Sequence, residues 1–267
     1  MFKDNLTLLI HSCGAYSDLW DGQVTLLERN WKDRGARTLI LTDTNPNNFN
    51  YTTVEIFTAG EGKEITDRLA SVLPNIDTEF VFVTLDDYYL IQKVDNARIA
   101  YLLSEMEKQN LDYIRLFPDP KSKDKIGDGI YKIHPEEKKS SYYLNLYAGI
   151  WRKSFIEKTL KGTMNAWQYE VSLTPLAREL HINCAMTNGS EYKILDVVRK
   201  GKLLHKAARY FKKDPVYNGN RVIIQRKEEF RIAFRTFMKK CLPRKIMQSI
   251  KRKMIKKGAT FYSPLDE

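Results

Sequence analysis

Short apolar runs alternate with amphipathic segments over the first 117 residues of the chain. The apolar runs are rich in β-branched and aromatic residues, which predicts buried strands at 6–10, 38–42, 54–57, 80–84 and 113–117. The amphipathic segments have helical spacing, which predicts helices at 19–32, 63–73 and 95–109. Because strands alternate with helices, we predict an α/β fold with a mostly parallel sheet, in which the loops after the strands share one edge.

The second half of the chain has a less regular pattern. Residues 118–141 are rich in Pro, Lys, Asp, Gly and Ser, which predicts an exposed loop that could fold over a substrate. An aromatic, strand-like run at 142–153 leads into a helix near Ser154, and another helix is predicted at 165–180. Two short strands are expected to follow, near 182–186 and 193–198.

The predicted strand at 80–84 runs through Leu85 into two adjacent carboxylates, Asp86 and Asp87. Ligand sites of open α/β sheets lie beyond the carboxyl ends of the strands, and Mg²⁺ and Mn²⁺ prefer carboxylate and phosphate oxygens. The pattern therefore predicts a divalent-metal site and a phosphorylated substrate. Tyr16 and Asp43 follow the first two strands, so we expect them at the same edge. The alternative, that the two acids cap a turn, stays open.

The length of 267 residues fits one large α/β domain with an appendage. The three cysteines, Cys13, Cys184 and Cys241, are scattered, so neither a disulfide framework nor a zinc ribbon is predicted, and a reducing cytosol fits best. No apolar stretch approaches the length that a bilayer crossing requires. We therefore expect a cytoplasmic location.

The net charge of +11 comes from one carboxyl-terminal segment. Residues 221–257 contain fourteen Lys or Arg and two acids, whereas the rest of the chain carries 30 basic and 31 acidic side chains. Apolar residues recur among the cations at helical spacing, which predicts one or two amphipathic helices interrupted near Pro243. Such a helix can lie on an anionic membrane surface. Packing of its apolar stripe on the protein's own domain is the alternative.

Nucleic acid is a third possible partner of the basic segment, since cations attract phosphate of any origin. The body of the chain has no helix-turn-helix, zinc or RNP-like module and is nearly neutral. Nucleic-acid binding is therefore disfavoured.

Three motifs in order resemble bacterial glycosyltransferases of the GT-A fold, most of all the family-2-like enzymes of capsule and O-antigen pathways. They are Leu85-Asp86-Asp87-Tyr88, Gly149-Ile150-Trp151-Arg152-Lys153 and Trp167-Gln168-Tyr169-Glu170. The likeness spans residues 5–205, which implies a GT-A domain at 1–205 and a basic helical region at 206–267. It implies transfer of a sugar from a nucleotide-sugar donor to a hydroxyl, with Mn²⁺ or Mg²⁺ at an Asp-x-Asp-type motif.

The resemblance also implies roles for the two acids at the strand end. Asp87 matches the acid that ligates the metal bridging the donor phosphates, and Asp86 the one that contacts the ribose, the donor sugar or the metal. Thr84 stands where a strict motif ending at Asp86 would have its first acid. Glu170 resembles the general base of inverting members, although at a helix start it could instead complete a cap or form a surface ion pair.

Aromatic residues are the remaining candidates for donor binding. Trp151 and Trp167 could stack on the apolar face of a sugar, with core packing the stronger alternative for Trp167. From their positions after strands, Tyr16 could flank a nucleobase and Asp43 could bind the base or the ribose. The resemblance also suggests His205 as a further metal ligand, although a phosphate contact from Lys202 or Lys206, or ordinary solvent exposure, is at least as well supported.

The resulting hypothesis is a metal-dependent, inverting glycosyltransferase of surface polysaccharide biosynthesis. Its acceptor would be a glycan or a polyprenyl-linked glycan, which places the enzyme at the inner face of the membrane. A sugar-phosphate nucleotidyltransferase is the main alternative, but it should have a Gly-rich, basic loop after the first strand, and residues 12–16 contain one Gly and no Lys or Arg. The second alternative is a non-catalytic protein of the same pathway.

Overall fold

The structure is a computed structural model that describes residues 2, 4–137, 142–241, 249 and 252. The chain forms two compact units. Unit 1 comprises Met1–Leu195 and Val216–Gly219, and unit 2 comprises Asp196–Pro215 and Asn220–Glu267. The expected domain boundary at residue 205 therefore falls inside unit 2.

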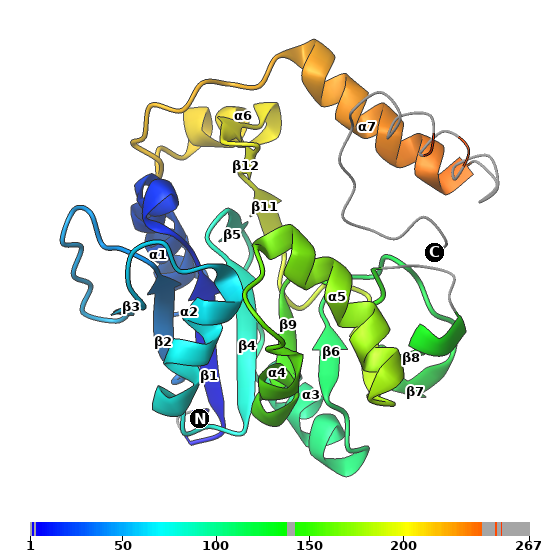
Figure 1. Cartoon of the computed structure of the whole chain (residues 1–267). Coiled ribbons are helices and arrows are strands. Elements are labelled where there is room, and N and C mark those ends of the chain that lie inside the picture. The colour runs from blue at the N-terminus through cyan, green and yellow to red at the C-terminus, as the bar shows by residue number, and fades with distance from the viewer. Residues whose placement is uncertain (1, 3, 138–141, 242–248, 250–251, 253–267) are drawn as a thin grey trace. The chain divides into compact units, whose positions relative to one another are not determined.

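Within the described residues, unit 1 is built on a nine-stranded sheet of order β3-β2-β1-β4-β9-β6-β10-β8-β7 (Figure 1). Its strands are β1 (Leu6–His11), β2 (Arg37–Thr42), β3 (Glu55–Thr58), β4 (Phe80–Leu85), β6 (Tyr113–Arg115), β7 (Lys125–Gly127), β8 (Ile130–Ile133), β9 (Gly149–Arg152) and β10 (Cys184–Thr187). Strand β9 runs antiparallel to β4 and β6, and β8 runs antiparallel to β10 and β7. The other neighbouring pairs are parallel, so the sheet is mixed, but every one of these strands except β8 and β9 runs in one direction. The predicted α/β fold with mostly parallel strands is confirmed.

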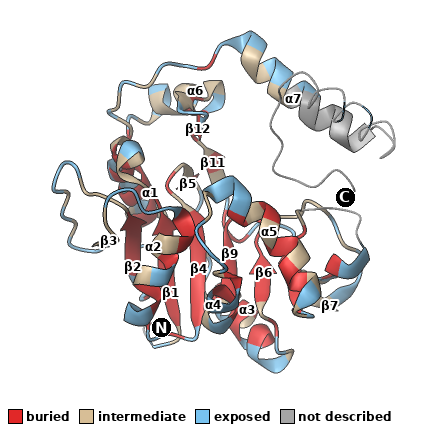
Figure 2. Ribbon diagram, in the orientation of Figure 1, coloured by how far each residue is buried: buried red, intermediate tan, exposed pale blue. Residues whose placement is uncertain are grey.

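Helices cover both faces of this sheet, and each face has its own apolar cluster. On one face pack α1 (Trp20–Trp31) and α3 (Asn96–Lys108). On the other pack α2 (Ile65–Val72), α4 (Lys153–Thr159) and α5 (Ala166–Glu179). Figure 2 shows the result, a sheet of buried strands between helices whose outer sides are exposed. Covered on both faces, β1 and β4 can be apolar almost throughout.

The carboxyl ends of β1, β2, β4, β6 and β10 lie along the same edge, because these strands run in one direction. We call this the carboxyl edge of the sheet. A short pair formed by β5 (Tyr88–Leu90) and β11 (Ile194–Asp196) follows β4. The amino end of β9 also lies at this edge, since β9 is reversed.

Two expectations for the middle of the chain are wrong. The segment 118–141 is not a plain loop, since β7 and β8 form a hairpin there and extend the sheet. Ile130 and Ile133 of this hairpin are buried in the core. Of the strand predicted at 142–153, only β9 forms, and residues 142–148 lead into it as turns and bends.

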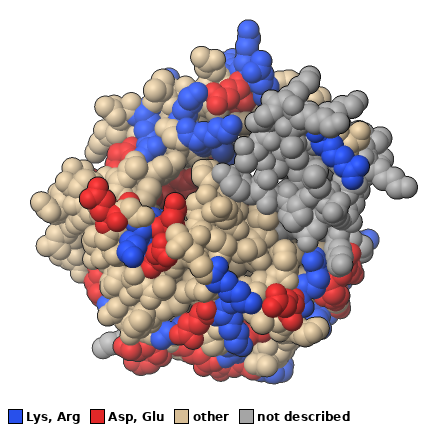
Figure 3. Space-filling model, in the orientation of Figure 1, with Lys and Arg blue, Asp and Glu red and all other residues tan. Residues whose placement is uncertain are grey.

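Unit 2 contains α6 (His205–Lys213), α7 (Arg226–Cys241) and the short strand pair β12 (Val198–Arg199) and β13 (Lys202–Leu203). A helix in the basic segment is thus confirmed, whereas the expected interruption near Pro243 lies outside the described residues. Among the residues described, none of the helices combines the length and apolar character that a membrane crossing needs. On the face drawn in Figure 3, cationic and anionic side chains are interspersed over unit 1.

Candidate active site

Asp86 is anchored at the end of β4 by the neighbouring strand. Its backbone N–H donates to the His11 carbonyl oxygen (3.0 Å), and its carboxylate accepts a short hydrogen bond from the Ser12 hydroxyl. The Trp20 indole N–H in turn donates to Ser12 Oγ at 2.6 Å. Asp86 is buried, and Asp87, the next residue, is half-buried. The backbone that carries both carboxylates is therefore held in place at the carboxyl edge.

Asp43, which follows β2, holds the loop after β1 in place. Its Oδ1 accepts from the N–H groups of Gly14 (2.7 Å) and Thr44 (2.8 Å). Partial burial opposes ionisation, but these two N–H groups and the charge of Arg68 outweigh it, so the pKa of Asp43 lies below its usual value. A Cβ at position 14 would lie 2.0 Å from Thr44 Oγ1, so a larger residue there would force the Thr44 side chain to move. Tyr16 follows in the 3₁₀ helix η1 (Gly14–Leu19), half-buried.

Arg68 is a further candidate site residue, which the sequence did not indicate. It lies on α2, and its charge acts on His11, Cys13 and Asp43, which places it beside the loop after β1. Burial, with the charges of Asp86 and Asp43, raises the pKa of the Cys13 thiol, while Arg68 opposes that rise. Arg68 therefore provides a cation close to the acids of the carboxyl edge.

Glu170 reaches the same region through the segment before β9. Its Oε1 accepts from the Leu146 backbone N–H at 3.2 Å. Because β9 pairs antiparallel with β4, and Gly149 lies opposite Val83, the chain before Gly149 runs alongside the end of β4. The rings of Tyr147 and Tyr88, 5.1 Å apart, confirm that proximity. Glu170 therefore binds a backbone segment that runs beside the end of β4, the strand that the two aspartates follow.

The helix-capping alternative for Glu170 is wrong. Asn165 caps α5 by accepting from the Gln168 N–H, and the Gln168 side chain accepts from the Asn165 N–H, which completes a capping box. Glu170 lies two residues further along the helix, half-buried, where its carboxylate holds the 146–147 segment.

The two tryptophans have the opposite environments from those expected. Trp151 is 1% exposed, and its ring packs in the core against Tyr113 and Phe155, so it has no face on which a sugar could stack. Its assignment to donor binding is therefore wrong. Trp167, for which core packing was favoured, is 62% exposed on the first turn of α5, three residues before Glu170.

Aromatic rings continue the carboxyl edge beyond Asp87. Phe117, which follows β6, stacks on Tyr147 with ring centroids 4.2 Å apart, and Tyr147 contacts Tyr88. Arg115, fully buried, fixes this part of the edge by donating to the backbone carbonyls of Phe117, Tyr143 and Pro120.

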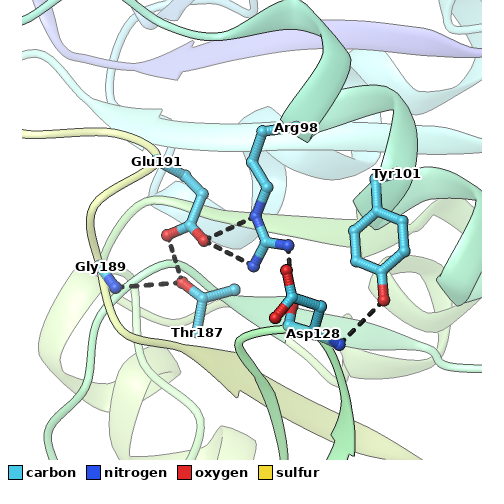
Figure 4. A network of polar contacts seen from close by, with 6 residues as sticks. All are labelled: Arg98, Tyr101, Asp128, Thr187, Gly189 and Glu191. Carbon is cyan, nitrogen blue, oxygen red and sulfur yellow. Dashed lines mark hydrogen bonds and ion pairs between the residues drawn. The ribbon is translucent and has the colours of Figure 1, made fainter.

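A network of polar side chains lies at the carboxyl edge of the sheet, next to the end of β10 (Figure 4). Arg98 of α3 donates to Glu191 Oε1 through Nε (3.0 Å) and Nη2 (2.9 Å), and Thr187 Oγ1 donates to Glu191 Oε2 (2.7 Å). Arg98 also donates to the carbonyl of Asp128, in the β7–β8 turn, at 2.7 Å. The network joins α3, the hairpin and the loop after β10, which makes the far end of the edge rigid.

A divalent cation fits the donor chemistry of the Asp86–Asp87 pair, since Mg²⁺ and Mn²⁺ prefer carboxylate oxygens. In the described part of the chain, no group of three or more His, Cys, Asp or Glu side chains could hold a metal ion. A cation held by Asp86 and Asp87 would need further ligands, such as substrate phosphates and water. His205 Nδ1 lies 2.7 Å from Glu229 Oε2 within unit 2.

No protein-family model matches the sequence, and no curated protein matches it either. Solved structures match the fold. Residues 1–349 of TarS from S. aureus, in complex with UDP-GlcNAc, align at a TM-score of 0.52 with 12% identity, covering 74% of this chain and 60% of that one. A UDP-glucose pyrophosphorylase complexed with UDP-glucose aligns at 0.50 with 14% identity, covering 79% of this chain and all of that one.

The chain shares the α/β fold of the TarS fragment and of the UDP-glucose pyrophosphorylase. A mannosyltransferase from Pyrobaculum calidifontis, in complex with GDP-Man and Mn²⁺, aligns at a TM-score of 0.49 with 9% identity, covering 75% of this chain and 59% of that one. This chain spans about three fifths of the length of the TarS fragment. At these identities the likeness establishes the fold alone, and the predicted GT-A-like fold is confirmed.

Proposed function

We propose that this protein is a glycosyltransferase that transfers a sugar from a nucleotide-sugar donor to a hydroxyl of a glycan or lipid-linked glycan in surface polysaccharide biosynthesis. One observation carries the proposal. Two carboxylates follow the central strand β4, and a third carboxylate, Glu170, accepts a hydrogen bond from the backbone of the segment that runs alongside the end of that strand. That arrangement supports a diphosphate site beside a position for a general base.

The donor would lie over the loop after β1. Tyr16 would flank its nucleobase, Asp43 would accept from the base or the ribose, and Arg68 would offset phosphate charge. Asp87 and Asp86 would hold a divalent cation, which would stabilise the negative charge on the departing nucleoside diphosphate.

Glu170 would take the proton of the acceptor hydroxyl as its oxygen bonds to the anomeric carbon. The bond from that carbon to the diphosphate oxygen would break in the same step, and the nucleoside diphosphate would leave with the electron pair. A single displacement of this kind inverts the anomeric configuration. The exposed ring of Trp167, one turn before Glu170, offers an apolar surface to an acceptor sugar.

A nucleotidyltransferase is the second candidate, favoured by the likeness to the UDP-glucose pyrophosphorylase. Such an enzyme needs backbone N–H groups and cations after β1 to bind a triphosphate. In this chain the Gly14 N–H donates to Asp43, and residues 12–16 carry no Lys or Arg. The loop therefore favours glycosyl transfer.

The test is a panel of UDP-, GDP-, dTDP- and CMP-sugars with Mn²⁺, Mg²⁺ or a chelator, read by thermal shift and by nucleotide release. We expect one donor to raise the melting temperature only with metal, and Asp87→Asn to abolish that shift. Glu170→Gln should keep the shift and lower transfer about 10²–10⁴-fold. Release of pyrophosphate from a nucleoside triphosphate and a sugar 1-phosphate, with no turnover of any nucleotide sugar, would overturn the proposal.

A further inference from the structure

The two faces of α7 differ in chemistry and in environment. Glu228 and Glu229 lie on one face, where Glu228 Oε2 accepts from Lys202 Nζ at 2.7 Å and Glu229 pairs with His205. Both partners belong to the earlier part of unit 2. The acidic face of the helix is therefore turned toward its own unit.

An apolar stripe occupies the opposite face of α7. Phe230 and Phe234 are one turn apart, and their rings stack with centroids 6.2 Å apart and an interplanar angle of 18°. At about 100° per residue, this pair lies roughly opposite Glu228 and Glu229. Phe230 is 70% exposed and Phe234 is 51% exposed. Two stacked phenylalanines held this far in solvent are unusual on a free surface.

Cations border this stripe. Arg226 lies one turn before Phe230 on the same face, and Lys227 and Arg231 lie along one side of it, all three exposed. The two acids of the segment 221–257 are the ones paired within unit 2, so the exposed face of α7 carries cations and no carboxylate over 226–234. Apolar rings bordered by exposed cations are complementary to acyl chains beneath anionic headgroups.

We propose that the Phe230–Phe234 face of α7 binds an anionic lipid surface, with the two rings inserted at the boundary between headgroups and acyl chains and Arg226, Lys227 and Arg231 on the lipid phosphates. This interaction is independent of the chemistry proposed for unit 1. Nucleic acid would use the same cations, but exposed phenylalanines arranged as a stacked pair on a helix favour a surface with an apolar interior.

The experiment is co-sedimentation of the full chain with vesicles of phosphatidylcholine alone or of equimolar phosphatidylcholine and phosphatidylglycerol. Binding is expected only with phosphatidylglycerol and should weaken as salt is raised. The double variant Phe230→Ser/Phe234→Ser should bind at least about tenfold more weakly. The triple variant Arg226→Gln/Lys227→Gln/Arg231→Gln should bind these vesicles about a hundredfold more weakly.

The matched control removes the same charge from exposed lysines of unit 1, as Lys32→Gln/Lys121→Gln/Lys123→Gln, and should bind like the wild type. Circular dichroism of each variant checks that the helix content is retained. Equal binding to both vesicle types, or equal losses in the control and in the α7 triple variant, would overturn the proposal. So would binding to a short DNA duplex, unaffected by the phenylalanine exchange, together with no binding to vesicles.

Discussion

His11 makes the stability of unit 1 dependent on pH. It ends β1 at 3% exposure, and neither ring nitrogen has a hydrogen-bond partner among the described residues. Burial, with a smaller contribution from the charge of Arg68, lowers the pKa of His11 to about 3. The imidazole is therefore neutral in the folded protein, whereas in the unfolded chain it takes up a proton below its ordinary pKa of about 6.5.

The sign and size of the effect follow from that difference. Between pH 6.5 and about 3 the unfolded chain binds one more proton than the folded protein, so stability is complete above this window and falls as the pH drops through it. The full slope is about 1.4 kcal/mol per pH unit. Between pH 7 and 5.5 the unfolded chain takes up this proton only in part at first. Over that range His11 should therefore lower the free energy of unfolding by about 1 kcal/mol.

Urea unfolding of the wild type and of His11→Leu at several pH values tests this. We expect the variant to lose about 1 kcal/mol less than the wild type between pH 7 and 5.5, whatever its absolute stability. His134→Gln gives a control of opposite sign. The side chain of Glu136, with that of Asp124, raises the pKa of His134, so its contribution is present below pH 6.5 and is lost as the pH rises. Parallel pH profiles for the wild type and His11→Leu would refute this account.

Three further outcomes are expected. Trp151→Phe should lower the free energy of unfolding, measured in urea, by about 1–3 kcal/mol, and Trp167→Phe by less than about 0.5 kcal/mol. Equal losses would contradict the burial of Trp151 and the exposure of Trp167. Arg68→Gln should weaken donor binding in calorimetry about tenfold or more, with Arg68→Lys restoring part of it, and unchanged affinity would remove Arg68 from the site. Gly14→Ala should cost about 1–3 kcal/mol and Gly14→Ala/Thr44→Ala less, because the clash is with Thr44 Oγ1; additive costs would contradict that cause.

Features of the fold that depend on local pattern could be predicted from the sequence. The apolar run of β4 stops at two acids, and that break alone indicated where a site would lie. The β7–β8 hairpin could not be predicted, because its strands are short and its composition is typical of a loop. Its Ile130 and Ile133 are nevertheless buried in the core. Tertiary pairing with β10 decides its structure.

Side-chain environments at the site were harder to infer. An arginine on a helix surface is normally solvated, so nothing in the sequence distinguishes Arg68 from the other cations; only the packing of α2 beside the loop after β1 does. The burial of Trp151 depends on β9 lying between β4 and β6, which periodicity does not reveal. Trp167 is exposed because it lies in the first turn of α5, and burial of the helix begins only at Tyr169.

The reversal of β9 brings the backbone segment that Glu170 binds to the end of β4. In a wholly parallel sheet, the segment before each strand lies at the amino edge, and only the residues after a strand can reach the site. Because β9 is antiparallel, residues 146–147 before it lie at the carboxyl edge beside the end of β4. Glu170, near the amino end of α5, accepts a hydrogen bond from the backbone of this segment. The reversed strand thus links the segment bound by the candidate base to the end of the strand that precedes the candidate metal ligands.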